Sequence, residues 1–133
     1  AALFAASLHF TLETALADEP LPVVADHEEL RRVLVNLLTN ATQAIPDGRD
    51  GHIWLATRAD GDDAVVTVRD DGTGIAPDVQ PKVVQPSFST KTSGTGLGLA
   101  ISKRAVEAAG GRIAFETAEG AGTTFTVRLP RAA

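Results

Sequence analysis

Three glycines stand at the start of a predicted helix, where glycine is normally unfavourable. Gly94, Gly96 and Gly98 alternate with other residues in the stretch GTGLGLAIS. The free backbone N–H groups and the dipole of a helix N-terminus attract anions, and glycines leave room for a phosphate group to approach the backbone. We therefore predict a flexible phosphate-binding lid that leads into the helix, with Lys91 as an additional cation. The alternative is a plain linker, which the regular apolar pattern of the following helix disfavours.

Two asparagines, Asn36 and Asn40, share one face of another predicted helix because they stand four residues apart in NLLTN. The leucines around them supply the apolar stripe, so the core does not need these amides. An amide oxygen is a hard ligand that suits Mg²⁺ in a shell of water and phosphate. The alternative is a solvated polar face, although asparagine is a poor helix former. The pair is therefore a candidate metal and phosphate site.

A carboxylate followed by glycines ends a predicted strand in the stretch DDGTGI, which begins at Asp70. Gly72 and Gly74 would allow the backbone to approach a flat ligand closely. An aspartate held at this point could accept a hydrogen bond from an exocyclic amine. Asp-Gly is also a common turn dipeptide, and a tight turn is the favoured interpretation of this stretch by itself.

The elements that must position these residues follow from hydrophobic periodicity. Asp26 is expected to cap a helix that carries the asparagine pair and ends before the Pro-Asp-Gly turn at residues 46–48. A second long helix is expected at residues 97–109, and a short one at 76–84. Alternating patterns predict strands at 7–15, 52–59, 64–70, 112–118 and 122–130. Hairpin-joined strands with helices on one sheet face indicate an α+β sandwich.

Size and composition narrow the class of protein. The 133 residues are enough for one domain, and a net charge of −5 argues against a general nucleic-acid binder. The sequence has no cysteine, which excludes disulfides and thiolate metal sites. It has no apolar run long enough to cross a bilayer, and its apolar start lacks the basic flank of a signal peptide. The absence of methionine suggests a piece of a longer polypeptide.

The motifs occur in the order Asn pair, Asp-Gly turn, glycine-rich lid and Gly-Thr strand, the last at residues 120–130. Together they resemble the N, G1, G2 and G3 boxes of the ATP-binding domain of bacterial sensor histidine kinases, in the superfamily shared with DNA gyrase, Hsp90 and MutL. LRRVLVNLLTNATQAI, VRDDGTGIAP and GTGLGLAIS are each similar to the family pattern, and FSTKTSGTGLGLAISK looks most like the nitrogen-regulation subtype.

The resemblance implies a Bergerat-type fold, in which a mixed, mostly antiparallel sheet packs against about three helices as a two-layer α/β sandwich. It implies a domain at residues 8–131, preceded at 1–7 by the tail of a helix or a linker.

The resemblance also implies roles for individual residues. Asp70 would bind the adenine amino group, Asn40 would ligate Mg²⁺, and Asn36 and Lys91 would act in catalysis at the phosphate end. Gln43 stands where many members carry Lys or Arg. The residues implied in nucleotide binding are Asn36, Asn40, Gln43, Asp70, Gly72, Gly74, Ile75, Lys91, Gly94, Thr95, Gly96, Leu97, Gly98 and Thr123.

The function that the resemblance implies is a protein histidine kinase of a two-component signalling system. The domain would bind ATP and Mg²⁺ and donate the γ-phosphate to a histidine on a separate dimerisation domain. That kinase would then supply the phosphate group to the receiver domain of a response regulator. The parent protein is expected to be a homodimer, with this domain in the cytoplasm. Whether the parent is anchored in the inner membrane is left open.

Two alternatives remain at this point. Water-activating relatives such as gyrase carry a glutamate base at the position of Asn36, and an amide cannot accept a proton at neutral pH. This disfavours a gyrase- or Hsp90-like ATPase, while a non-catalytic nucleotide-sensing module stays possible on sequence grounds. His9, His27 and His52 do not lie in a dimerisation helix, and they are expected to be ordinary surface histidines.

Overall fold

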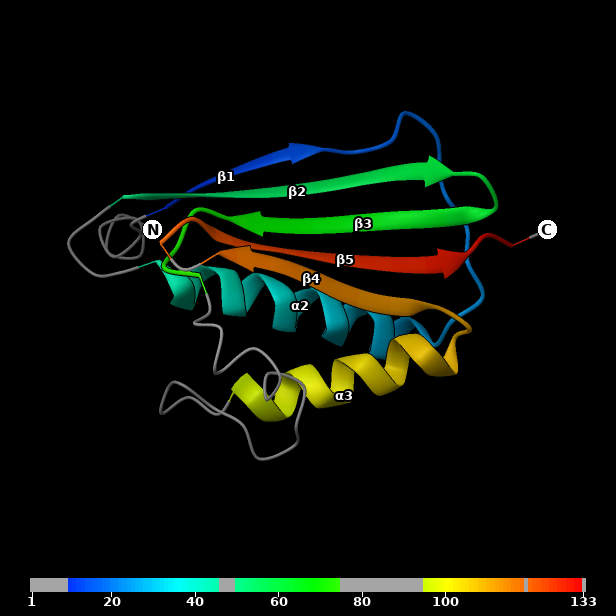
Figure 1. Cartoon of the computed structure of the whole chain (residues 1–133). Helices are drawn as coiled ribbons and strands as arrows, with labels where there is room; N and C mark the ends of the chain where they lie inside the picture. The colour runs from blue at the N-terminus through cyan, green and yellow to red at the C-terminus, as the bar shows by residue number, and fades with distance from the viewer. Residues whose placement is uncertain (1–9, 46–49, 75–94, 119, 133) are drawn as a thin grey trace, which may run out of the picture.

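Among the residues that the structure describes, a mixed five-stranded sheet forms one layer, and two helices cover one of its faces (Figure 1). The computed structural model describes residues 10–45, 50–74, 95–118 and 120–132. The strands are β1 (Phe10–Ala15), β2 (Gly51–Asp60), β3 (Asp63–Asp70), β4 (Arg112–Ala118) and β5 (Gly122–Pro130), and the helices are α2 (His27–Ala44) and α3 (Thr95–Ala108). The α+β sandwich expected from the sequence is confirmed, and the short helix expected at 76–84 lies outside the described residues.

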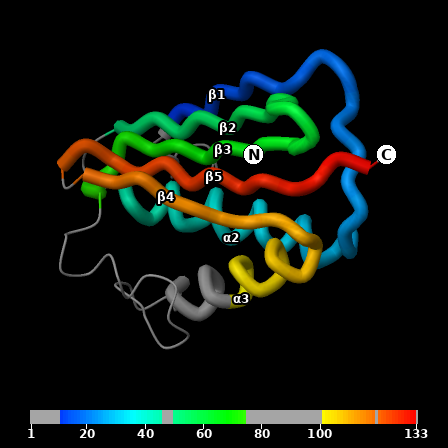
Figure 2. The backbone as a smooth tube through the Cα atoms, turned by 45° about the vertical axis from the view of Figure 1, so that its right-hand side comes forward, coloured from blue at the N-terminus to red at the C-terminus, as the bar shows by residue number. Residues whose placement is uncertain are grey.

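The sheet has the strand order β1-β2-β3-β5-β4. The β1–β2 pair is parallel, and the other three pairs are antiparallel. The tube of Figure 2 shows the same two layers, with α2 and α3 side by side beneath the sheet and running in opposite directions. Because β3 and β5 are neighbours at the centre, the end of β3 meets the start of β5.

Helix α2 forms where the sequence predicts it. The side chain of Asp26 accepts a hydrogen bond from the backbone N–H of Glu29 at 3.0 Å, which caps the first turn. Val33, Leu37 and Ala41 recur at helical spacing and are buried against the sheet. The core that they enter also contains Ile45, Ile53, Val68, Val106, Phe125, Val127 and Leu129. Burial of this stripe fixes which face of α2 is left for the asparagines.

Helix α3 begins at Thr95, two residues earlier than the glycine content predicts. Glycine weakens an isolated helix, but tertiary packing supplies most helical stability in proteins, and here α3 packs along α2. The helix ends as predicted before two glycines: Gly110 has a φ of 81°, and Gly111 donates its N–H to the carbonyl of Val106 at 2.9 Å.

The alternation of apolar and polar residues in β1 predicts one buried face, but the structure does not show one among the described side chains. The side chain of Leu12 is 47% exposed, and the described residues on either side of it are exposed as well. The reason is that β1 is an edge strand, while α2 packs mainly on β3 and β5. Alternation therefore predicted the strand correctly, but the cover over it was decided by the position of the helices.

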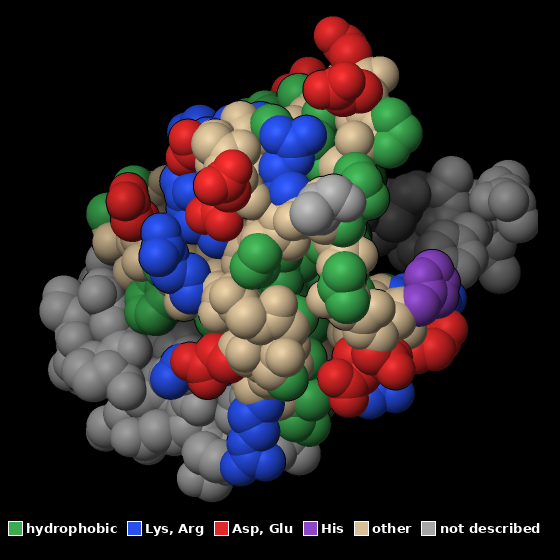
Figure 3. Space-filling model, turned by 90° about the vertical axis from the view of Figure 1, so that its right-hand side faces the viewer, with side chains coloured by type: hydrophobic (Ala, Val, Ile, Leu, Met, Phe, Trp, Pro, Cys, Tyr) green, Lys and Arg blue, Asp and Glu red, His purple; other side chains and the backbone are tan. Residues whose placement is uncertain are grey.

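The end of the molecule with the β2–β3 turn shows acidic and basic side chains side by side (Figure 3). Near this turn, Arg128 of β5 lies 2.6 Å from the carboxylate of Asp60 and 3.2 Å from that of Asp63. These ion pairs join the turn to β5. Within the described residues, neither helix is both long and apolar enough to cross a membrane.

Candidate nucleotide-binding site

Asp70 ends β3 with its carboxylate in the protein interior, where the residue is only 4% exposed. One carboxylate oxygen accepts a hydrogen bond from the N–H of Gly72 at 2.8 Å. Across the ladder Asp70 pairs with Thr123 of β5, which is 5% exposed. The hydroxyl of Thr123 lies 2.9 Å from that of Thr117 on β4. A buried carboxylate and two hydroxyls therefore lie on three adjacent strands at one end of the sheet.

Two glycines allow the backbone to pack tightly around this carboxylate. A Cβ atom at Gly72 would overlap the carbonyl of Ala44 in the last turn of α2. A Cβ atom at Gly122 would overlap the carbonyl of Asp70, and Gly122 has a φ of 98°. The N–H of Thr73 donates to the Ala44 carbonyl at 3.0 Å. The turn that ends β3, the last turn of α2 and the start of β5 thus converge at one place.

The polar face of α2 points toward α3. Asn36, Asn40 and Gln43 follow at spacings of four and three residues, so they share this face. The amide nitrogen of Asn36 donates to the hydroxyl of Ser102 at 3.2 Å. The amide nitrogen of Asn40 is buried, and among the described residues it has no hydrogen-bond partner. Buried amides are normally satisfied, so Asn40 is a site where a ligand or ordered water is expected.

The glycine-rich stretch divides between described and undescribed residues. The backbone of Thr95, Gly96, Leu97 and Gly98 forms the first turn of α3. Gly74 follows β3 with a φ of 71°, a conformation that other residues rarely adopt. Ile75, Lys91 and Gly94, which the sequence also assigns to the site, lie outside the described residues.

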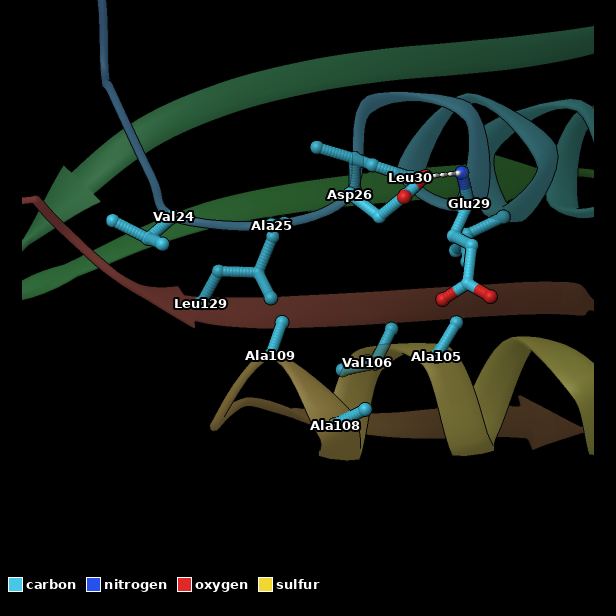
Figure 4. A pocket seen from close by; sticks show the side chains of 11 residues that line it. Val24, Ala25, Asp26, Glu29, Leu30, Ala105, Val106, Ala108, Ala109 and Leu129 are labelled. Atoms are coloured by element: carbon cyan, nitrogen blue, oxygen red, sulfur yellow. Dashed lines mark hydrogen bonds between the residues drawn. The ribbon is translucent and has the colours of Figure 1, made fainter.

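Two hollows outlined by described residues lie between α2 and α3, and neither includes Asp70 or Thr123. One, of about 180 Å³, lies where α2 begins and α3 ends, and Figure 4 shows Leu129 and the alanines of α3 around it. The other, of about 260 Å³, extends along the helices as far as Asn36 and Ser102. Since the carboxylate of Asp70 lines neither hollow, the Asp70 end of the candidate site rests on its polar residues.

Sequence reasoning missed two polar residues at this site. Ser102 is completely buried, and Thr117 contacts both Thr123 and the carbonyl of Gly122, the latter at 3.1 Å. A serine within the apolar pattern of α3 was a visible signal, but its partner lies 66 residues away. Asp71 has a different task from Asp70, since it accepts a hydrogen bond from the backbone N–H of His52 at 2.8 Å.

Comparisons with known proteins place this arrangement in a family. Residues 25–133 match the model of the histidine kinase-, DNA gyrase B- and HSP90-like ATPases. This chain belongs to that family. Its fold matches the catalytic domain of histidine kinase ThkA with a TM-score of 0.82 and 32% identity, over 98% of this chain and 86% of that one. The chain is therefore a histidine kinase catalytic domain, as its motifs predict.

A curated relative agrees with this assignment. Sensor histidine kinase ZraS of Klebsiella oxytoca is 45% identical over 131 residues, which are 98% of this chain and 27% of the relative. Full-length ShkA in complex with AMPPNP matches with a TM-score of 0.73 and 35% identity, over 92% of this chain and 26% of that one. This chain spans about a quarter of the length of the ZraS relatives that it matches.

Proposed function

We propose that this domain binds ATP together with Mg²⁺ and donates the γ-phosphate to a histidine on a separate dimerisation domain of its parent protein. The observation that carries the proposal is the buried carboxylate of Asp70, enclosed by close backbone approaches at Gly72 and Gly122. The parent would be a homodimeric sensor kinase that passes phosphate to a response regulator. This domain would act in the cytoplasm, whether or not its parent carries a membrane anchor.

The adenine end of the nucleotide would be recognised at Asp70. A carboxylate can only accept hydrogen bonds, and the exocyclic amine of adenine is a donor. Since Asp70 is buried, this hydrogen bond would form away from bulk water, where it is stronger and more selective. Thr123 and Gly74 would complete this end, together with Gly72 and Ile75. The full-length ShkA structure contains AMPPNP, an adenine nucleotide, in a protein of similar fold.

The phosphate end would lie between the last turns of α2 and the first turn of α3. The proposed Mg²⁺ ligand is the side-chain oxygen of Asn40, while its buried amide nitrogen, which has no partner among the described residues, would donate a hydrogen bond to a phosphate oxygen. An amide oxygen is a ligand that Mg²⁺ accepts beside phosphate oxygens, whose charge the cation would neutralise. The backbone of Thr95, Gly96, Leu97 and Gly98 would offer free N–H groups to the phosphates. Gln43, Lys91 and Gly94 are proposed as further contacts.

The presence of an amide at Asn36 favours transfer of the phosphate to a side chain over hydrolysis of ATP by water. Its amide cannot accept a proton from water at neutral pH, so this chain offers no base at that position. Catalysis would then rest on positioning and on charge neutralisation, with an incoming imidazole as the nucleophile. We assign Asn36 and Lys91 to the orientation of the reacting phosphate. The nitrogen-regulation subtype remains a proposal that rests on the sequence of the lid.

Asp70→Asn tests the adenine end. Asparagine can still accept the hydrogen bond from Gly72, so the turn should persist, but it presents a donor to the adenine amine. We expect ATP affinity to fall roughly 10- to 100-fold, because a charge-assisted bond is replaced by a repulsive contact. Isothermal titration calorimetry measures this effect. Affinity equal to that of the wild type would contradict the assignment of Asp70.

The reaction itself is tested by mixing the chain with the dimerisation domain of its parent and ATP labelled at the γ-phosphate. Acid-labile label on a histidine of that domain is the expected product. Steady phosphate release by this chain by itself, lost in Asn40→Ala, would favour a gyrase- or Hsp90-like ATPase. Tight ATP binding with no labelled histidine and no release would favour a nucleotide-sensing module.

A further inference from the structure

The contact between Asn36 and Ser102 joins the two helices that border the phosphate end of the site. The amide nitrogen of Asn36, on α2, donates to the hydroxyl oxygen of Ser102, on α3, at 3.2 Å. Ser102 is 0% exposed and its neighbour Val106, one turn further along α3, is 1% exposed. A hydroxyl in such surroundings is costly unless it is hydrogen-bonded. The contact therefore has a larger effect than a surface hydrogen bond would.

The helices place this contact next to the glycines of the lid. Ser102 follows Gly98 by four residues and so lies on the same face of α3, one turn later. Figure 1 shows that α2 and α3 run in opposite directions, so the residues that follow Asn36 along α2 lie beside the residues that precede Ser102 along α3. Asn40 follows Asn36 by four residues and Gly98 precedes Ser102 by four residues, so both lie one turn from this contact.

We propose that Ser102 is a positioning residue that fixes the amide of Asn36 for the phosphate end of the nucleotide. With its nitrogen committed to Ser102, the amide of Asn36 has a defined orientation, and its oxygen lies on the other side of the planar group. Asn40 differs because its amide nitrogen has no such partner among the described residues. The hydroxyl also couples the orientation of Asn36 to α3, whose first turn carries the lid glycines. This inference rests on the proposed function of Asn36.

Ser102→Ala tests the inference with two readouts on the whole chain. We expect the dissociation constant for ATP in the presence of Mg²⁺ to rise about 5- to 10-fold, as the loss of one buried hydrogen bond predicts. Adenosine has no phosphates, so its dissociation constant should differ from that of the wild type by less than about 2-fold. This change is smaller than the one expected from the loss of a hydrogen bond. The side-chain amide signal of Asn36 in a ¹⁵N NMR spectrum should shift in the absence of any nucleotide.

Two further variants separate positioning from stability. Val106→Ala makes a cavity in the same helix, so it should lower the melting temperature while leaving nucleotide affinity and the Asn36 amide signal unchanged. Ser102→Thr keeps the hydroxyl and should restore most of the Mg²⁺-dependent affinity. Unchanged ATP affinity and an unshifted Asn36 signal in Ser102→Ala would overturn the inference. Equal effects of Val106→Ala and Ser102→Ala on both readouts would overturn it as well.

The same measurements distinguish this inference from the function on which it depends. If the wild-type chain binds no ATP, the proposed function fails first, whatever Ser102 does. If the wild-type chain binds ATP in a manner that Mg²⁺ strengthens, and Ser102→Ala behaves identically, the function stands and the positioning role is wrong.

Discussion

At the scale of single residues, Gly122 determines how closely β5 can approach Asp70. A side chain at this position would need both a left-handed backbone and space that the carbonyl of Asp70 already fills. We expect Gly122→Ala to destabilise the fold by more than about 2 kcal/mol, which corresponds to roughly 6 to 10 °C in melting temperature. ATP affinity at a temperature where the variant is folded should fall as well, because the carboxylate must move.

Gly120 provides the matched control for this substitution. It also has a positive φ, of 82°, but apart from its chain neighbours no atom of the described residues lies within 4 Å of a Cβ atom built there. Gly120→Ala should therefore lower the free energy of unfolding by only about 1 kcal/mol, because alanine rarely adopts this backbone conformation. ATP affinity should be unchanged. Thermal unfolding followed by circular dichroism compares the two. Equal losses in both variants would show that the close approach to Asp70 is unimportant.

At the scale of elements, Arg128 ties β5 to the turn between β2 and β3. Its hydrogen bond and charge lower the pKa of Asp60 below the usual value of 3.8. A carboxylate whose folded pKa is depressed stabilises the fold above its unfolded pKa, and this contribution is lost as pH falls through the folded value. The melting temperature of Arg128→Met should thus lie below that of the wild type at pH 7. This difference should shrink below pH 3.8.

Arg31→Met is the comparison for this pH series. Arg31 lies 3.9 Å from Glu28, and both side chains are about 70% exposed. Such exposed pairs contribute little to stability, so this variant should melt close to the wild type at every pH. A difference between Arg128→Met and the wild type that does not depend on pH would assign the role of Arg128 to packing instead of charge.

At the scale of the whole molecule, the candidate site draws on both layers of the fold. Asp70 and Thr123 come from the sheet, whereas Asn36 and Asn40 come from α2 and the glycines from α3. A ligand that contacts all of them binds only the folded chain. ATP with Mg²⁺ at about 100 times its dissociation constant should stabilise the fold by about 2.7 kcal/mol, or roughly 10 °C.

Nucleotide identity and Asp70→Asn control this thermal shift. GTP carries a carbonyl where adenine carries its amine, so it should raise the melting temperature much less than ATP does. Asp70→Asn should shrink the shift with ATP in the same way. A shift of equal size with both nucleotides would indicate that phosphate alone is recognised and that Asp70 does not read the base.

The sequence by itself determined the elements and the motif residues. The stripe of Val33, Leu37 and Ala41 predicted α2, Asp26 predicted its cap, and alternation predicted β2 to β5 with bounds within a few residues. These features depend on periods of 3.6 and 2 residues and on hydrogen bonds within one turn, so they can be recognised within a short stretch of sequence. The family motifs identified Asp70 and the asparagine pair for the same reason.

Only the tertiary structure decided which of these residues meet. Asp70 lies beside Thr123 because β5 inserts next to β3, and Asn36 contacts Ser102 across 66 residues because two helices pack antiparallel on one face of the sheet. The same packing extended α3 through its glycines and left Leu12 exposed on the edge strand. Contacts between segments far apart in the chain depend on strand order and layer packing, which no local period of the sequence encodes.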